Sequence, residues 1–495
     1  MLKSRPAPAS LPPLARAGRN VLVKLAGELA ARVLFALLFI YAARLLGAAD
    51  FGRYSFAASL AALAFIGMDL GLNTLLVREG AQHPEQVGRY AGTLFVLKSL
   101  LAAAVLLGLL AFCLGMNYPR QQTLLVMAVA LGQTFWGYCE LGVAGFNALE
   151  RMEQEALVKS LARFLALLLA GGMLLAGLGL WGLVGGLLAA NLAAAVLALT
   201  RLGGLVGWRV RPQMAAAGRF MREGLPLALT SVFMLVYFRV DMVMLELLGE
   251  GFVEIGWYGA AVRVIDAAGM LPALVMASLL PVLSSLAPRD RQAMARLYRQ
   301  GQRLLLMLGL PAALGMWMLR RPFTELVFGP QYEGTVAAFA WLSPMLAVLF
   351  LNHLQLGQLT ALGLQRLCAW ATGACVLVNL GLNLALIPPY GYQGAAAATL
   401  ATEVVLFGLC GWFIHRHLGP TGLLKRLWRP AAATALMGLA LNWRGDWPLL
   451  AVVPAAMVLY GAALLLIGGI TPAELRELAD TLRARSAGDG RRQAG

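Results

Sequence analysis

The chain has 495 residues, of which 60% are hydrophobic and only 13% are charged, and its mean hydropathy is +0.74. Because a soluble globular protein carries about 25% charged residues, this composition excludes a soluble domain and predicts an all-α integral membrane protein. The formal net charge of +16 does not indicate nucleic-acid binding, because the basic residues recur in short segments between apolar runs and form no single patch.

The first 20 residues contain Lys3, Arg5, Arg16 and Arg19 and no acidic residue, and we interpret them as a cytoplasmic tail. A signal peptide fits less well, because the following apolar run is interrupted by charged residues and continues to Leu46. Apolar runs of about the length of a membrane helix, roughly 20 residues, then recur along the chain. The predicted spans are 21–46, 54–77, 91–115, 123–147, 157–177, 181–202, 225–248, 257–285, 299–320, 334–361, 367–388, 393–414, 431–443 and 448–470. We therefore expect about 14 transmembrane helices, followed by a charged cytoplasmic tail over 471–495.

The charge of the loops alternates along the chain. The segments 203–223 and 415–430 are rich in arginine, whereas 178–180 and 388–392 carry no charge. The positive-inside rule then places both termini of this multi-pass protein in the cytoplasm, and we expect it in a bacterial inner membrane, as the family resemblance given below implies.

The two halves of the chain share sequence motifs. The pattern Leu-Leu-Gly followed by Phe-Gly-x-Tyr ends at Tyr54, and a similar pattern ends at Tyr258. Six spans per repeat keep the halves parallel, and binding sites in such transporters lie near mid-membrane at the repeat interface. We expect a first six-helix lobe over 21–202, a basic cytoplasmic linker over 203–224, a second lobe over 225–415, and a basic loop with two extra helices over 416–470.

Four ionisable residues lie inside the seventh and eighth spans: Arg239, Asp241, Arg263 and Asp266. A charge at mid-span costs about 2.5–3.5 kcal/mol on insertion scales, so such residues by default face a bundle interior or a cavity. Arg263 and Asp266 are three residues apart and share a helix face. We expect one carboxylate to neutralise one arginine while another arginine faces the lumen.

Each of the other polar residues inside the predicted spans has two possible roles. Glu28 and Arg32 lie in the first span, and Arg32 matches Asp69 of the second span in depth, so these two either form an ion pair or serve the substrate. Glu403 is a candidate proton-coupling or ion-pair residue. Asn379 and Asn383 either contact sugar or form interhelical hydrogen bonds.

The remaining side-chain chemistry is sparse. The five cysteines lie in apolar runs without metal-ligand spacing, and we interpret them as core residues. Trp257, Tyr258, Tyr390 and Trp443 fit an interfacial aromatic belt. The sequence shows no nucleophile–base set, nucleotide motif, metal site or cofactor site, so we predict no enzyme and expect an ion or substrate gradient to supply the energy.

Several motifs resemble the polysaccharide-export, oligosaccharide-flippase branch of the multidrug/oligosaccharidyl-lipid/polysaccharide exporter superfamily. They are ARLLGAADFGRYSFAASLAALAFIGMDLGLNTLLVREGA from Ala43, GWYGAAVRV from Gly256, FGPQYEG from Phe328, ALGLQR from Ala361 and NLGLNLALIPPYGYQGAAAAT from Asn379. The resemblance covers 30–415 and implies a flippase for polyprenyl-pyrophosphate-linked oligosaccharide, used in cell-surface polysaccharide synthesis and working by alternating access between two lobes.

The resemblance also suggests residue roles and partners. By position, Arg32 and Arg263 correspond to cavity arginines of related lipid II flippases, whereas the second span departs by offering Asp69. We therefore predict Arg263 as the first pyrophosphate ligand, with Arg239 and Arg32 next. In those flippases a C-terminal helix pair forms an apolar groove for the lipid tail. Membrane lipids, a polysaccharide polymerase and export proteins are the implied partners. A drug or cation antiporter of the same superfamily and a lipid II flippase are the alternatives.

Overall fold

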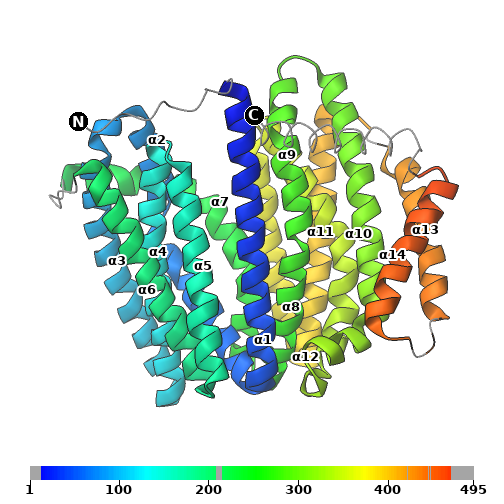
Figure 1. Cartoon of the computed structure of the whole chain (residues 1–495), viewed down its shortest axis with the longest axis horizontal. Helices are drawn as coiled ribbons and strands as arrows, with labels where there is room; N and C mark the ends of the chain where they lie inside the picture. Colours follow the sequence, from blue (N-terminus) through cyan, green and yellow to red (C-terminus); the bar gives the residue numbers. More distant parts are fainter. Residues whose placement is uncertain (1–12, 208–213, 421, 444, 446, 470–495) are drawn as a thin grey trace, which may run out of the picture. The chain divides into compact units, whose positions relative to one another are not determined.

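The computed structural model describes residues 13–207, 214–420, 422–443, 445 and 447–469, and within these ranges the regular structure is entirely helical (Figure 1). In the first helix the side chains are described from Leu34 onward. The predicted tail over 471–495, most of the N-terminal tail and the centre of the predicted linker fall outside the described residues. The helices are α1 (Pro13–Asp69), α2 (Leu72–Gln82), η1 (Pro84–Gln86), α3 (Val87–Gly115), α4 (Arg120–Ala148), α5 (Met152–Leu175), α6 (Gly179–Val206), α7 (Met214–Leu247), α8 (Phe252–Ala268), α9 (Met270–Leu286), α10 (Arg291–Val327), η2 (Pro330–Tyr332), α11 (Thr335–Ala361), α12 (Gln365–Leu418), α13 (Leu423–Asn442) and α14 (Leu449–Leu466).

Two of these helices each contain two predicted spans, separated at a glycine. Gly47 in α1 has φ 76° and ψ 169°, and Gly391 in α12 has φ 58° and ψ −141°. Only glycine adopts such conformations readily, so the chain changes direction there, between the predicted spans 21–46 and 54–77 and between 367–388 and 393–414.

The second predicted span is not one continuous helix. It ends at Asp69 and resumes at Leu72, because Leu70 (φ 42°) and Gly71 (φ 78°) both have left-handed backbone. The eighth predicted span is likewise divided at Gly269 into α8 and α9.

Ten of the described helical segments are long and apolar enough to cross a membrane. The expectation of an all-α integral membrane protein is therefore confirmed. The total of 14 spans stays a prediction.

The chain forms two compact units. The first comprises Met1–Met270, Val327–Ala338 and Ala369–Ala398, and the second comprises Leu271–Leu326, Phe339–Cys368 and Thr399–Gly495. These boundaries cut across the predicted lobes, which remain a prediction.

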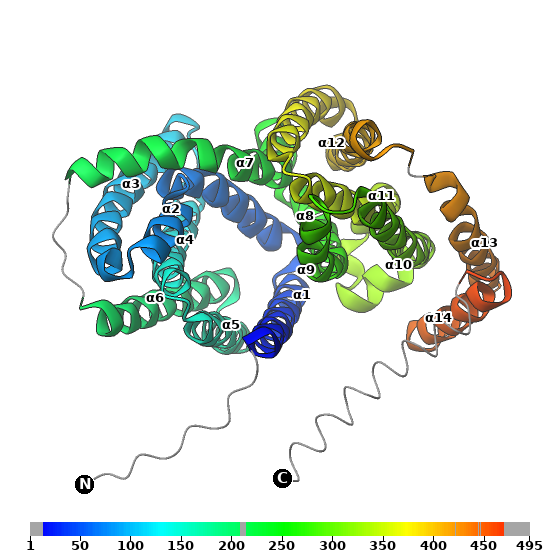
Figure 2. The same cartoon turned by 90° about the horizontal axis from the view of Figure 1, so that it is seen from above.

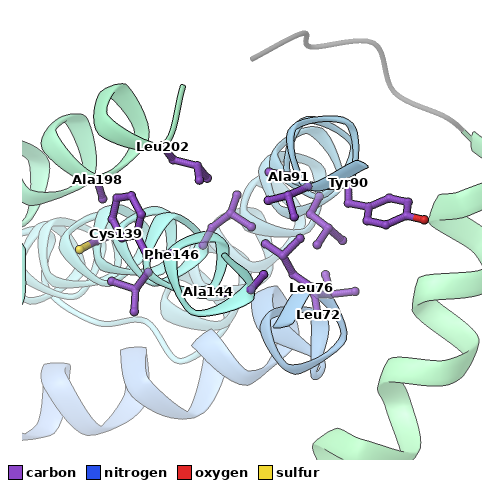
Figure 3. Close-up of a cluster of buried hydrophobic side chains, with 14 of the residues drawn as sticks. Leu72, Leu76, Tyr90, Ala91, Cys139, Ala144, Phe146, Ala198 and Leu202 are labelled. Atoms are coloured by element: carbon purple, nitrogen blue, oxygen red, sulfur yellow. The ribbon is translucent and has the colours of Figure 1, made fainter. Parts of the chain in front are cut away.

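A buried apolar cluster supports α2 to α6 of the first unit (Figure 3). Leu72 and Leu76 of α2 lie beside Ala144 of α4, whereas Phe146 of α4 lies beside Ala198 of α6. Tyr90 of α3 contacts Phe220 of α7 edge-on with 5.5 Å between ring centroids. Figure 2 shows these helices end-on, with α4 between α2 and α6.

Small residues allow the helices of the first unit to approach closely. A Cβ atom at Gly142 of α4 would lie 2.7 Å from Ala198 Cβ of α6, and one at Gly186 of α6 would lie 2.5 Å from Ala170 N of α5. Such contacts are typical of membrane helices, where dispersion at small residues replaces the hydrophobic driving force of soluble proteins. Helices α1 and α8 approach each other in the same manner at Gly52 and Gly256.

In the second unit, α10 packs against the C-terminal helices α13 and α14. Met307 and Leu319 of α10 share a buried cluster with Met437 and Tyr460, and Tyr460 Oη donates to Met307 O at 2.8 Å. All five cysteines of the chain are buried and free, which confirms their interpretation as core residues.

Candidate functional site

Among the described residues of the predicted site, Arg263 of α8 has the least compensated charge. Its guanidinium lies over the ring of Phe39 of α1, with 4.4 Å from Cζ to the ring centroid. Such stacking stabilises a cation by about 0.5–2 kcal/mol and leaves the edge of the guanidinium plane for hydrogen bonding. Among the described residues, Arg263 forms no ion pair and no hydrogen bond.

Arg239 of α7, in contrast, is paired. Its Nη2 atom lies 3.3 Å from Asp266 Oδ2 of α8, and the two side chains are 24% and 36% exposed. The structure thus has the predicted arrangement in which one carboxylate neutralises one arginine, and it identifies the pair.

Asp241 of α7 is held by hydrogen bonds. The residue is 5% exposed, and its carboxylate accepts from the backbone N–H of Met242 at 2.8 Å and from the hydroxyl of Tyr258. Tyr258 is therefore not part of an interfacial belt, and this prediction was wrong. The residue is fully buried, and its hydroxyl donates to the Asp241 carboxylate.

A third arginine, which sequence reasoning missed, belongs to the same region. Arg163 of α5 lies over the rings of Phe35 and Trp136, at 4.1 and 5.0 Å from Cζ to the centroids. Tyr54 of α1 is close enough to Arg163, Arg239 and Arg263 to interact electrostatically with each of them. Among the described side chains, this region of the first unit holds Arg163, Arg239 and Arg263 together with the carboxylates of Asp241 and Asp266.

Asp69 forms an ion pair with a buried lysine, and its role in coupling stays a prediction. Lys98 of α3 is fully buried, and its Nζ donates to Asp69 Oδ1 at 2.7 Å and to Asn73 Oδ1 at 2.8 Å. Asp69 ends α1 and Asn73 belongs to α2, so Lys98 ties together the two sides of the break. The side chains of Glu28 and Arg32 lie outside the described residues, and with them the predicted Arg32–Asp69 pair.

Asn379 and Asn383 are both buried in α12. Asn383 Nδ2 donates to Asn379 Oδ1 at 2.9 Å, and Asn383 and Asn379 are 0% and 1% exposed. This bond lies within one helix and not between helices. Their assignment as sugar-contacting residues stays a prediction.

Glu403 is buried in the second unit. Asn352 of α11 donates through Nδ2 to Glu403 Oε2 at 2.6 Å and to Glu403 O at 2.9 Å. The amide thereby fixes both the carboxylate and the backbone at this point of α12. The role of Glu403 in coupling stays a prediction.

Two cavities of about 240 Å³ each lie within single units. One is lined by α1, α4, α5 and α6 of the first unit, and the other by α13, α14 and the segment between them, including Met437, Trp443 and Trp447. Within the described part of the chain, no group of three or more His, Cys, Asp or Glu residues is arranged to hold a metal ion.

Comparisons with known proteins agree with this fold. Residues 17–287 match the family model described as polysaccharide biosynthesis protein, and residues 226–385 match the MatE model. No curated protein sequence matches the chain.

Solved transporter structures share the fold at low sequence identity. The lipid II flippase MurJ in an inward closed conformation is 14% identical with a TM-score of 0.74, covering 88% of this chain and 97% of that one. An inward-facing multidrug resistance MATE family transporter is 15% identical with a TM-score of 0.64, covering 82% and 99%. A MOP superfamily transporter from Pyrococcus furiosus is 14% identical with a TM-score of 0.53, covering 81% and 95%.

The first family model covers more than half of the chain, and it spans Arg163, Arg239 and Arg263. The matched families consist of membrane transporters and flippases, and ten apolar helical segments make this chain a multi-pass membrane protein. The protein belongs to the polysaccharide biosynthesis protein family, within the multidrug/oligosaccharidyl-lipid/polysaccharide exporter superfamily.

Proposed function

We propose that this protein moves a polyprenyl-pyrophosphate-linked oligosaccharide from the cytoplasmic to the outer leaflet of a bacterial inner membrane. Transport proceeds by alternating access and serves cell-surface polysaccharide synthesis, with both termini in the cytoplasm. A polysaccharide polymerase then receives the glycan.

The observation that carries this proposal is the state of Arg263. Its charge has no carboxylate partner among the described residues, whereas the neighbouring Arg239 is neutralised by Asp266. An arginine offers a pyrophosphate two parallel charge-assisted hydrogen bonds, and it stays charged in surroundings of low dielectric constant. The anionic pyrophosphate of the substrate therefore supplies the negative charge that balances the Arg263 guanidinium.

The same observation weighs against the antiporter alternative. A cationic drug would meet the charge of Arg263, which has no carboxylate partner among the described residues. The lipid II flippase alternative shares the pyrophosphate and differs only in the glycan. The likeness to the fold of MurJ supports a lipid-linked substrate for both flippase readings.

The C-terminal cavity supports a place for the lipid. It lies between α13 and α14 and is lined by apolar and aromatic residues, including Met437, Leu459 and Trp443. A polyprenyl tail matches this apolar lining, because a hydrocarbon chain needs no hydrogen-bond partner and gains dispersion contacts with apolar side chains.

Accumulation of lipid-linked oligosaccharide in the cytoplasmic leaflet tests the proposal. We expect Arg263→Ala to abolish export at matched protein levels, and Arg263→Lys to restore only part of it, because an ammonium group lacks the bidentate geometry. Arg53→Ala is the matched control, since Arg53 is exposed and paired with Asp50 at 2.9 Å.

Normal export by Arg263→Ala would refute the role of Arg263. Accumulation of peptidoglycan precursor alone in the variant would favour the lipid II alternative over the oligosaccharide substrate.

A further inference from the structure

The first unit contains a cavity whose lining differs from that of an apolar packing defect. Its volume of about 240 Å³ equals that of about eight liquid water molecules at ~30 Å³ each. This space accommodates a group of the size of one sugar ring. The lining includes Phe35, Tyr54, Gln133, Trp136, Arg163 and Asn191.

The cavity presents polar groups that the fold itself does not use. Gln133 of α4 makes no hydrogen bond within the described part of the chain. Asn191 of α6 donates through Nδ2 to Gly132 O at 3.1 Å, which leaves its carboxamide oxygen without a partner among the described residues. A polar group in a membrane protein that faces a cavity without a partner indicates a polar ligand or water.

Aromatic rings and a cation complete the lining. Trp136 and Phe35 hold the Arg163 guanidinium within the range of cation–π contact, about 6 Å. Few polar groups among aromatic side chains are typical of pockets that bind and orient a small polar ligand. The positive charge of Arg163 disfavours a cation as that ligand.

The cavity adjoins the cationic site through shared aromatic residues. Phe35 contacts Phe39 edge-on with 4.8 Å between centroids, and Phe39 in turn carries Arg263 at 4.4 Å. Tyr54 lines the cavity and stacks on Phe39 at 5.6 Å. A group bound at Arg263 and a group in the cavity are therefore neighbours.

We propose that this cavity holds the sugar ring attached to the pyrophosphate of the substrate. The inference rests on the proposed function and extends it, because it assigns the pyrophosphate to Arg263 and the first sugar to the α1–α4–α5–α6 cavity. The indole of Trp136 stacks on the apolar face of the ring, while Gln133, Asn191 and Arg163 bind its hydroxyl groups.

The test compares two soluble probes on the full-length protein in nanodiscs. Farnesyl pyrophosphate carries the anionic head alone, and farnesyl-pyrophosphoryl-glucose adds one sugar. We expect the glycosylated probe to bind about tenfold more tightly, which corresponds to about 1.4 kcal/mol. Equal affinity of the two probes would overturn the inference.

Variants locate the effect of the sugar. Trp136→Ala and Gln133→Ala should each reduce the difference between the probes and leave the affinity for farnesyl pyrophosphate unchanged. Trp136→Phe keeps a stacking ring and should retain most of the difference. Trp181→Ala is the matched control, because Trp181 of α6 is 49% exposed and does not line the cavity. A difference that survives both Trp136→Ala and Gln133→Ala would place the sugar elsewhere.

Arg263→Ala separates this inference from the proposed function. It should weaken both probes alike. If it changes neither while Trp136→Ala still acts on the glycosylated probe alone, the pyrophosphate assignment fails and the sugar site stands. If neither probe binds to the wild-type protein, both proposals fail together.

Discussion

Gly52 of α1 faces the backbone carbonyl of Phe252 in α8, one helical turn before Gly256. Gly256 in turn faces the backbone carbonyl of Ala48 in α1, one helical turn before Gly52. A Cβ atom at Gly52 of α1 would lie 1.7 Å from Phe252 O of α8, and one at Gly256 would lie 1.9 Å from Ala48 O. Gly256 lies 204 positions after Gly52, and Phe252 lies 204 positions after Ala48. The contact is therefore reciprocal between the two sequence repeats. The helices approach so closely that neither position accepts a side chain.

We expect Gly52→Ala and Gly256→Ala each to separate α1 from α8, because the clashing atoms belong to the backbone and cannot rotate away. The thermal unfolding temperature of the purified protein should fall for both. Gly108→Ala is the control, since Gly108 of α3 faces open space and alanine there favours the helix by up to about 1 kcal/mol.

Thiol labelling measures the same separation directly. Ser55 is 3% exposed, so the thiol introduced by Ser55→Cys should react with maleimide only when Gly52→Ala is also present. A thiol at this position that stays unreactive in both backgrounds would contradict the expected separation.

Removal of one partner from the Lys98–Asp69 pair should be costly. Asp69→Asn leaves the fully buried Lys98 without its carboxylate, and an uncompensated buried charge of this kind costs roughly 3–5 kcal/mol. Lys98→Met should cost less, because the Asp69 side chain is 29% exposed. The double variant Lys98→Met/Asp69→Asn should lose less than the sum of the single losses, as measured by a double-mutant cycle of unfolding free energies. Arg53→Met breaks the exposed pair with Asp50 and should cost about 1 kcal/mol or less. Additive losses at Lys98 and Asp69 would show that the pair is not coupled.

Tyr258→Phe should destabilise the protein more than Tyr332→Phe. Both tyrosines are fully buried, but Tyr258 donates to the Asp241 carboxylate, whereas Tyr332 donates to the neutral Ala43 carbonyl at 2.8 Å. Hydrogen bonds to charged groups contribute about 1.5–3 kcal/mol and those between neutral groups about 0.5–1.5 kcal/mol. Thermal unfolding of both variants measures the difference. An equal loss for the two would argue that the Asp241 carboxyl is not charged in the folded protein.

Glu250, in the loop between α7 and α8, should make stability depend on pH. Burial raises the pKa of this carboxyl above its ordinary 4.5, and the negative charge of Glu254 raises it further. Because the folded state binds this proton more tightly than the unfolded chain, the contribution to stability is fully present below pH 4.5 and is lost as the pH rises through the raised value.

Unfolding temperatures measured at acidic and neutral pH test this dependence. Glu250→Gln should unfold at a higher temperature than the wild type at neutral pH and should show a weaker dependence on pH. Glu150→Gln, at an exposed turn, is the control. The same pH dependence in Glu250→Gln and wild type would assign the effect to another group.

The apolar runs predicted most of the fold, because a membrane helix must be continuous and apolar to satisfy its backbone in lipid. The breaks at Gly47 and Gly391 coincide with predicted loops for the same reason. The break at Leu70 and Gly71 was not predicted, because the apolar residues on both sides give one run of span length and Leu70 adopts the left-handed conformation without being a glycine.

The site was predicted only in part. Charged residues are easily recognised in an apolar sequence, so Arg239, Arg263, Asp241 and Asp266 were identified. The pairing of one arginine with one carboxylate was predicted because an unpaired charge inside a membrane costs free energy. Arg163 was missed although it lies inside the predicted span 157–177. Arg163 is placed at the site by its contacts with the rings of Phe35 and Trp136, which lie in other helices. No local sequence pattern indicates that these three side chains are in contact.

The reciprocal contact between Gly52 and Gly256 has the form of an isologous interface, in which the same patch serves both sides of a twofold axis. In a homodimer each residue occurs in both subunits, so a cation near the twofold axis would lie close to its own copy and be repelled by it. Here the two copies are encoded separately, and the counterpart of Arg263 under the same 204-residue offset is Ser59. Helices α1 and α8 therefore pack as closely as in a symmetric interface, but only α8 carries a cation at this position. A ligand with one charged end has one orientation in such a site and not two.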